Sequence, residues 1–276
     1  MKETSFTADK TPVKAKPGLL GRGARFVKRV PKRWVKQAVT PWLGSLRAVA
    51  TTERVAALTF DDGPHPEYTP RLLELLARHD AKATFFLVGA AAEAHPEVVR
   101  QIVEGGHALA NHTFDHRSVP LLSREERVEQ LRRCAAVLAP FGGDNGLFRP
   151  PYGHQDRAAR LDALRLGYEV VAWSEHAFDW LEHDSAFFVE RLEDKLRPGS
   201  IFLLHDTLYR MENPALADRG AILTALDTFL AGQQAYRFLT VPELLKRGKP
   251  QRFLWFRPAD PAWLQEVDPL GLGAAP

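Results

Sequence analysis

Two adjacent carboxylates stand at the end of the first strongly apolar run of the chain. Residues 55–60 (VAALTF) are followed by Asp61 and Asp62 and then by Gly63-Pro64. Successive side chains of a strand point in opposite directions unless a turn redirects them, and Gly-Pro supplies such a turn. One aspartate can therefore bind a cation while the other stays free as a base. Asp-Asp-Gly-Pro is also ordinary turn chemistry, so this segment carries little weight alone.

Two histidines lie at the end of another apolar run, HALANHT at residues 107–113. His112 is within the run and His116 follows it. His112 and His116 are four residues apart, a spacing that places both on one face of a helical turn and suits a single metal ion. With Asp62 they form an Asp-His-His set that leaves positions open for water and substrate, as catalytic metal sites do. An isolated pair of this kind is more often two surface histidines in a loop, so the pair needs support from other segments.

Three further apolar runs lead into polar segments whose chemistry differs from one to the next. The segments are RPPYG at residues 149–153, WSEHAFDW at 173–180 and LLHD at 203–206. Each has a simple structural explanation when taken alone. Because five such segments fall in order, each at the predicted carboxyl end of a strand, we interpret them as parts of one active site.

The apolar runs that carry these segments predict the fold. They occupy residues 55–60, 83–89, 107–113, 146–148, 168–173, 200–206 and 236–241. Runs that are apolar on both faces and separated by amphipathic helices indicate buried parallel strands in repeated βα units. About seven units predict a closed or nearly closed α/β barrel, with an open doubly wound sheet as the alternative.

The ordered segments TFDDGP, HTFDH, RPPYG, FDW and LLH resemble the five motifs of the NodB homology domain, the polysaccharide deacetylases of carbohydrate esterase family 4. The resemblance covers about residues 53–246, and five motifs in order make it highly specific. It implies a distorted (β/α)7 barrel, in agreement with the strand count. It also implies an enzyme that removes acetyl groups from sugars with one divalent metal ion, most commonly Zn²⁺.

The resemblance assigns a role to each motif residue. Asp62, His112 and His116 would hold the metal ion, and Asp61 would be the general base, held in place by Arg149.

Asp179 would orient His205, the general acid, and the backbone N–H of Tyr152 would face the oxyanion. The substrate-binding residues would be Pro151, Tyr152, Trp180 and Leu203. One position departs from the family pattern, because many members carry an acid three residues before the motif-four aspartate, where this chain has His176.

Charge is distributed unevenly over the 276 residues. Residues 1–50 hold 12 Lys and Arg against two acidic residues, a net of +10, whereas the rest holds 25 basic and 32 acidic residues, a net of −7. The acidic body argues against nucleic-acid binding. We expect a disordered basic tail at 1–18, a basic amphipathic arm at 19–50, the catalytic domain at 51–248 and a proline- and aromatic-rich tail at 249–276.

The arm at residues 19–50 interleaves aromatic and basic side chains, which predicts contact with an anionic membrane surface. The alternative is that its aromatic residues pack against the acidic body. No run of about 18 apolar residues and no signal peptide is visible, so the predicted location is cytoplasmic, with a peripheral membrane contact allowed by the arm. A single cysteine, Cys134, excludes a disulfide framework and a Cys-based zinc site.

The chain has the composition of an ordinary soluble globular protein, with 45% hydrophobic and 26% charged residues. The predicted function is metal-dependent removal of acetyl groups from N-acetylated sugars of the chitin-oligosaccharide or peptidoglycan type. Two alternatives stay open: another hydrolase of non-peptide C–N bonds, such as a deformylase, and a non-catalytic carbohydrate-binding homologue.

Overall fold

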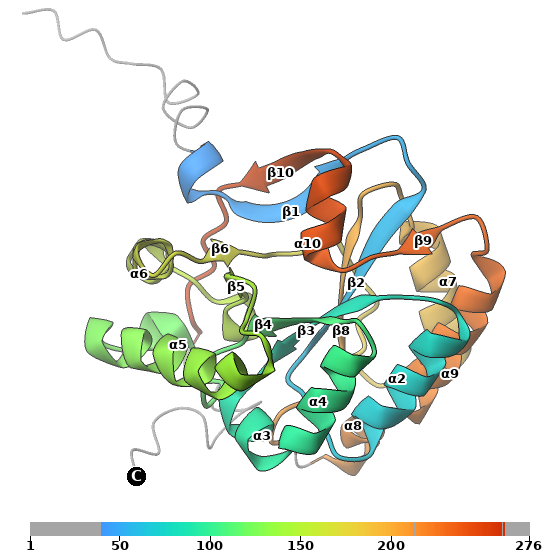
Figure 1. Cartoon of the computed structure of the whole chain (residues 1–276), viewed down its shortest axis with the longest axis horizontal. Helices are drawn as coiled ribbons and strands as arrows, with labels where there is room; N and C mark the ends of the chain where they lie inside the picture. Colours follow the sequence, from blue (N-terminus) through green and yellow to red (C-terminus); the bar gives the residue numbers. More distant parts are fainter. Residues whose placement is uncertain (1–39, 212, 261, 263–276) are drawn as a thin grey trace, which may run out of the picture.

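A computed structural model describes residues 40–211, 213–260 and 262. Its main sheet is parallel, with strands in the order β6-β5-β4-β3-β2-β8-β7 and with β9 paired to β2 (Figure 1). The strands are β2 (Val55–Asp61), β3 (Ala83–Leu87), β4 (Ala108–Asn111), β5 (Leu147–Phe148), β6 (Glu169–Val170), β7 (Glu175–His176), β8 (Ile201–His205) and β9 (Arg237–Phe238). Six of the seven predicted apolar runs contain one of these strands, the run at 55–60 covers β2 except for Asp61, and β7 is the additional strand.

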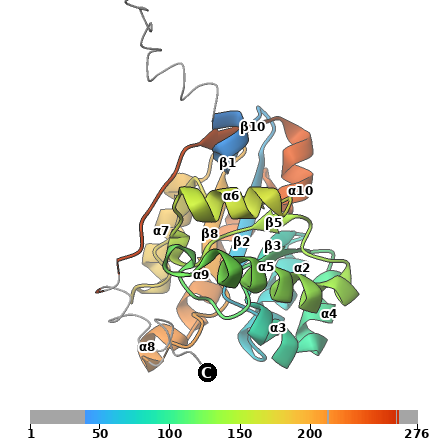
Figure 2. The same cartoon turned by 90° about the vertical axis from the view of Figure 1, so that its left-hand side faces the viewer.

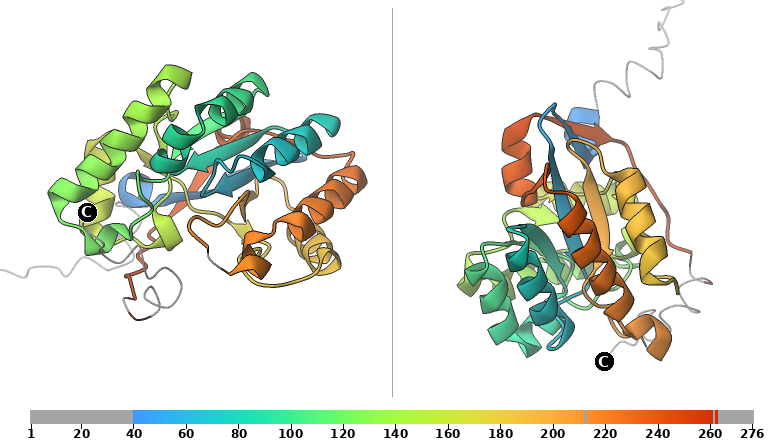
Figure 3. Two further views of the ribbon diagram at one scale, coloured as in Figure 1. Left: turned by 90° about the horizontal axis from the view of Figure 1, so that it is seen from below. Right: turned by 90° about the vertical axis from the view of Figure 1, so that its right-hand side faces the viewer.

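Helices connect most of the strands, and most of these helices cover the outer face of the curled sheet (Figures 1 and 3), whereas Val241 and Leu244 of the last helix join the interior apolar cluster. They are α2 (Tyr68–Arg78), α3 (Gly89–Ala94), α4 (Pro96–Glu104), α5 (Arg124–Leu138), α6 (Arg157–Arg165), α7 (Ser185–Lys195), α8 (Pro214–Ala217), α9 (Gly220–Gly232) and α10 (Val241–Leu244). Short 3₁₀ turns are η1 (Val119–Leu121), η2 (Ala139–Phe141), η3 (Pro151–Gly153) and η4 (Leu245–Arg247). This is the distorted (β/α)7 barrel that the sequence predicts.

Two strands at the ends of the described chain complete the barrel wall. β1 (Ser45–Ala50) pairs antiparallel with β10 (Lys249–Phe253). β1 also bridges the main sheet on both sides of its opening, through Leu46 to Val171 and through Ala48 to Ser200. Among the described residues, the edge strands β7 and β6 are not paired with each other, so the barrel is open between them. β1 spans this opening.

The position of β1 and β10 bears on the expected division of the chain. Residues 45–50 fall within the expected basic arm and residues 249–253 within the expected tail, and these two segments pair with each other as β1 and β10, with β1 bridged to the main sheet. The predicted tail at 1–18 and most of the arm at 19–50, with its membrane contact, lie outside the described residues. Among the residues that are described, no helix is long and apolar enough to cross a membrane.

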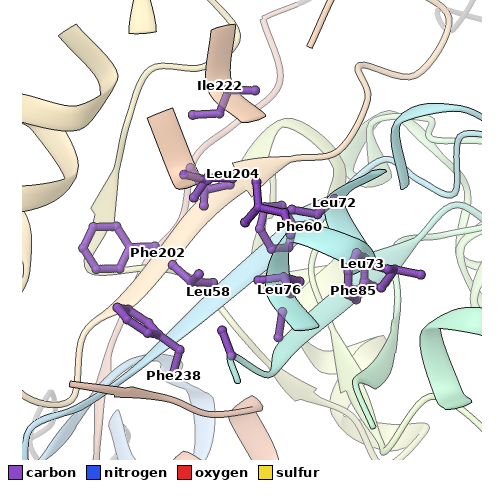
Figure 4. Close-up of a cluster of buried hydrophobic side chains, with 14 of the residues drawn as sticks. Leu58, Phe60, Leu72, Leu73, Leu76, Phe85, Phe202, Leu204, Ile222 and Phe238 are labelled. Carbon is purple, nitrogen blue, oxygen red and sulfur yellow. The ribbon is translucent and has the colours of Figure 1, made fainter. Parts of the chain in front are cut away.

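The core lies in two layers because β2 is buried on both faces. Its residues Ala56, Leu58 and Phe60 pack against the covering helices, where Leu72 and Leu76 of α2 meet them (Figure 4). The alternate residues point into the barrel and join a second apolar cluster that includes Val55, Ala57, Phe86, Ala110, Leu147, Val171 and Ile201. Side chains that point into the barrel therefore recur every second residue.

Candidate active site

The same two-residue alternation brings the chemistry-bearing side chains together. Every second residue along β2, β4, β5 and β8 points into the barrel. Toward the carboxyl ends, the inward-pointing residues that follow Ala57, Ala110, Leu147 and Ile201 include Asp61, His112, Arg149, Leu203 and His205. Because the carboxyl ends of parallel strands meet at one end of a barrel, these residues converge there. The interior face thus changes from apolar to polar at that end.

Asp62, His112 and His116 form a compact buried group, as predicted. One candidate donor atom from each lies within 4.8 Å of the other two. The Nε2 atoms of His112 and His116 lie 3.3 and 3.0 Å from the same oxygen, Oδ1 of Asp62. Burial raises the pKa of Asp62, but the charge of His116 and the hydrogen bonds from both histidines outweigh it and hold the pKa well below its usual range. Asp62 is therefore ionised.

The opposite ring nitrogen of each histidine is already engaged. Nδ1 of His112 is 2.7 Å from the carbonyl oxygen of Arg149, so it carries the proton and donates it. Nδ1 of His116 is 3.1 Å from the hydroxyl of Tyr152. Partners of this kind fix the ring orientation and tautomer of metal-binding histidines. Both Nε2 atoms are thereby directed at the position that a metal ion would occupy.

The backbone that presents these residues is irregular, and the expected helical turn at residues 112–116 is wrong. Asp62, Thr113 and His116 have φ angles of 78°, 68° and 65°, in the left-handed region. Asn111 Oδ1 accepts the N–H of Thr113, and Thr113 Oγ1 accepts the N–H of His116. These side chains provide hydrogen-bond acceptors for the backbone N–H groups of the loop, so the two histidines come together without a helix.

Asp61 has a different environment from Asp62, as the sequence predicts. Its Oδ1 accepts a hydrogen bond of 2.6 Å from Nη1 of Arg149, whereas Oδ2 lies 3.9 Å from Nε2 of His112. Arg149 is fully buried, and its guanidinium also donates to Thr59 Oγ1 and to two backbone carbonyls. One charge-assisted hydrogen bond from this buried guanidinium thus holds Oδ1 of Asp61, and Oδ2 is left on the side of His112.

His205 is paired with a buried carboxylate. Its Nδ1 is 3.0 Å from Oδ1 of Asp179, and its backbone N–H donates to Oδ2. Arg219 donates to the same Oδ2 at 2.6 Å. Burial lowers the pKa of His205, but the charge and hydrogen bond of Asp179 outweigh it and raise that pKa to about 9. The imidazole is thus held as a cation with Nε2 as its second donor.

The predicted substrate-binding residues surround these groups. Trp180 packs edge-on to the His205 ring, with centroids 5.8 Å apart, and Leu203 is buried on the interior face of β8. Pro151 and Tyr152 lie in η3, where Tyr152 has a φ of 57°. His176, the departure from the family pattern, packs against Phe178 and Trp180 with centroids 4.2 and 5.2 Å away.

Three contributors were not found from the sequence. Thr59, which accepts from Arg149, shares the interior face of β2 with Asp61, so the alternation could have indicated it. Arg219 and Tyr209 lie in loops without a pattern, and the N–H of Tyr209 donates to Oδ2 of Asp62 at 3.0 Å. Nothing in their local sequence points to the site, because their contacts depend on how distant loops pack.

Comparisons with known proteins define the class. The family profile for polysaccharide deacetylase matches residues 48–171. A peptidoglycan-N-acetylglucosamine deacetylase of Bacillus cereus is 35% identical over 202 residues, which cover 72% of this chain and 91% of that protein. A chitooligosaccharide deacetylase of Azorhizobium caulinodans is 36% identical over 166 residues, 59% of this chain and 79% of that one.

Solved structures agree with the sequence comparison. A peptidoglycan N-acetylglucosamine deacetylase, crystallised with a naphthalenyl N-hydroxybenzamide, superposes with a TM-score of 0.68 at 28% identity, over 80% of this chain and 99% of that one. A carbohydrate esterase family 4 pseudoenzyme of Bacillus anthracis has a TM-score of 0.64 at 26% identity, over 75% and 70% of the two chains. The present chain belongs to the polysaccharide deacetylase family, carbohydrate esterase family 4, and is a hydrolase of that class.

Proposed function

We propose that this deacetylase removes acetyl groups from N-acetylated sugars of the peptidoglycan or chitooligosaccharide type, with a divalent metal ion at Asp62, His112 and His116. The observation that carries the proposal is that three groups of different charge and hydrogen bonding meet at one end of the barrel. They are a buried Asp-His-His set, a carboxylate fixed by a buried arginine, and an imidazolium fixed by a buried carboxylate. The named relatives support the substrate class.

Asp62, His112 and His116, which we call the metal set, fit a zinc ion. Two imidazole nitrogens and one carboxylate oxygen are the donors of catalytic zinc sites, which keep a position open for water. The engaged Nδ1 atoms of His112 and His116 supply the supporting contacts that such ligands have in other proteins. When bound there, the ion acts as a Lewis acid that makes water more acidic and polarises a carbonyl oxygen.

Asp61 is the proposed general base. Its Oδ1 is occupied by Arg149, so the proton of the attacking water goes to Oδ2, which lies on the side of His112. The water oxygen forms a bond to the acetyl carbon as its proton moves to this carboxylate. Arg149 therefore sets which oxygen of Asp61 reacts.

His205 is the proposed general acid. Asp179 holds Nδ1, so Nε2 carries the proton that passes to the sugar nitrogen when the C–N bond breaks. The products are acetate and an amino sugar. Asp179 stabilises the charged ring and orients it, and Arg219 holds Asp179 in turn.

The remaining residues shape the substrate site. The left-handed conformation of Tyr152 presents its backbone N–H at the turn, where it would donate to the carbonyl oxygen as that oxygen becomes negative. Pro151 restricts the same turn. Trp180 and Leu203 would enclose the acetyl methyl group, because both present apolar surface next to His205.

The test is amine release from N-acetylated chitooligosaccharides and from peptidoglycan by the full chain. We expect release in the presence of Zn²⁺, loss after chelation, and recovery when Zn²⁺ returns. Parallel reactions with N-formylated substrates test the deformylase alternative, because they compare the rates of amine release from formyl and acetyl substrates. A preference for formyl groups would overturn the proposal. Binding of the sugars without any release would instead support the non-catalytic alternative, as in a pseudoenzyme.

For the basic arm at residues 19–50 we propose contact with an anionic membrane surface. Each basic residue near such a surface contributes about 1 kcal/mol, and salt weakens the attraction. We expect the full chain to sediment with anionic vesicles at low salt and to be released by high salt. A variant that lacks residues 1–39 but keeps β1 is the control, and equal sedimentation of both would contradict the proposal.

A further inference from the structure

The segment that follows β10 runs along the turn that carries Tyr152. We call residues 254–258 the C-terminal strap; Figure 2 shows the chain descending from β10 along the side of the barrel. The N–H of Gln155 donates to the carbonyl of Arg257, and the N–H of Arg257 donates back to the carbonyl of Gln155, at 2.9 and 3.1 Å. The Gln155 side-chain amide also donates to the carbonyl of Trp255 and to Ser45 Oγ. Four hydrogen bonds thus tie Gln155 to β1 and the strap.

The indole of Trp255 lies directly against this turn. It meets the Trp173 ring edge-to-face, with centroids 4.9 Å apart. A Cβ atom built on Gly153 would lie 2.6 Å from the Trp255 ring and 2.9 Å from the Trp173 ring. Gly153 also has a φ of 66°. Only glycine fits there, because both the conformation and the two indoles exclude a side chain.

These contacts lead to the reacting groups along two short routes. Gly153 follows Tyr152, whose hydroxyl contacts Nδ1 of His116. Trp173 faces the guanidinium of Arg149 at 5.7 Å, and that guanidinium holds Asp61. The indole of Trp255 therefore contacts both the turn that carries Tyr152 and the Trp173 ring beside Arg149. It lies behind the residues that hold His116 and Asp61 in place.

We propose that Trp255 is a positioning residue, which holds the Tyr152 turn and the Trp173–Arg149 stack in the arrangement that deacetylation requires. The proposal rests on the proposed function for its kinetic readout. The strap lies outside residues 48–171, which the family profile matches, so this support comes from the chain's own C-terminal segment. Misplacement of reacting groups by about 1 Å can cost about 10²-fold in rate.

The test compares Trp255→Ala, Trp255→Phe and Phe256→Ala in the full chain loaded with Zn²⁺. Phe256 is the matched control, because it is the next aromatic residue and is 38% exposed. We expect Trp255→Ala to lower kcat by about 10- to 100-fold with KM changed less than about twofold. Trp255→Phe, which keeps an aromatic ring, should recover most of the rate, and Phe256→Ala should match the parent.

A second readout does not depend on activity. The visible absorption spectrum of Co²⁺ in the metal set reports the orientation of His116, so Trp255→Ala should change the spectrum and Phe256→Ala should not. A parent protein that binds Co²⁺ but releases no acetyl groups would refute the proposed function while leaving this readout intact.

Three results would overturn the positioning role. The first is an unchanged kcat and spectrum in both Trp255 variants. The second is a rise in KM alone, which would make Trp255 a substrate contact. The third is a loss of kcat in Trp255→Ala that disappears at temperatures where melting curves show that variant fully folded, because the loss would then come from unfolding of the protein and not from misplaced reacting groups.

Discussion

The two halves of the site differ in how their charges are balanced. In the half that we propose to bind the metal ion, Asp61 and Asp62 are both buried, and in the described chain Arg149 is the only arginine or lysine that pairs with either of them. In the acid half, one carboxylate, Asp179, is matched by Arg219 and by the cationic ring of His205. Among the described residues, Asp62 thus has only histidine rings as charged partners, whereas Asp179 has both an arginine and an imidazolium.

The largest effect should come from removing two metal ligands. We expect His112→Ala combined with His116→Ala to abolish metal binding and deacetylation together, because a single carboxylate remains. Elemental analysis and amine release measure the two losses. Zn²⁺ should also raise the melting temperature of the parent but not of this variant, since a bound ion stabilises only a fold that binds it.

The control for that variant is His79→Ala combined with His95→Ala, which removes two histidines distant from the metal set in sequence and not among its donors. Full metal content in the His112/His116 variant would show that the site has been misassigned.

Asp61→Asn should have the next largest effect. It removes the base but leaves all three ligands, so kcat should fall by about 10²–10⁴-fold while metal content stays at the parent level. Asp62→Asn is the matched change on the neighbouring residue and should lose metal instead. If the two variants exchange these outcomes, the roles of the adjacent aspartates are reversed.

In the acid half, Asp179→Asn and His205→Ala should each lower kcat without loss of metal. Both changes impair the same proton transfer, so the double variant should be little worse than His205→Ala. Arg219→Met should have a smaller effect of about 10- to 100-fold, which corresponds to the loss of a charged hydrogen bond of about 1.5–3 kcal/mol. Fully additive losses would mean that these residues act independently.

The smallest expected effect is a shift in pH dependence. The pKa of His205 is raised to about 9 by Asp179, after burial has lowered it. The acid form is present below that pKa and is lost as the pH rises through it, so activity should decline on the alkaline side. Asp179→Asn removes the charge that raises the pKa, and the alkaline limb should move to lower pH. A limb that stays in place would assign the alkaline decline to another group.

The two halves also differ in how far the sequence predicts them. Asp62, His112 and His116 occur in short motifs at strand ends, and alternation along buried strands directs Asp61 and His205 inward. The fold was predictable for the same reason, since the apolar runs mark the strands. Strand periodicity carries no information about loop packing, so Arg219 and Trp255 could not be predicted.

The error at residues 112–116 has a local cause. A spacing of four residues fits a helical turn, but the side chains of Asn111 and Thr113 accept backbone N–H groups that a helix would use otherwise. Two left-handed residues then bring the histidines together by another route.

The unequal lengths of the strands have a consequence for motion. β2 has seven buried residues, whereas β5, β6 and β7 have two residues each. Segments with few backbone hydrogen bonds open locally at low free energy, whereas the most buried strands open only with the whole domain. The loops after β5 and β7, which carry Tyr152 and Trp180, are thus attached to the easily opened side of the sheet. Amide hydrogens of these loops should therefore exchange with solvent faster than those of β2, which measures the difference in local opening.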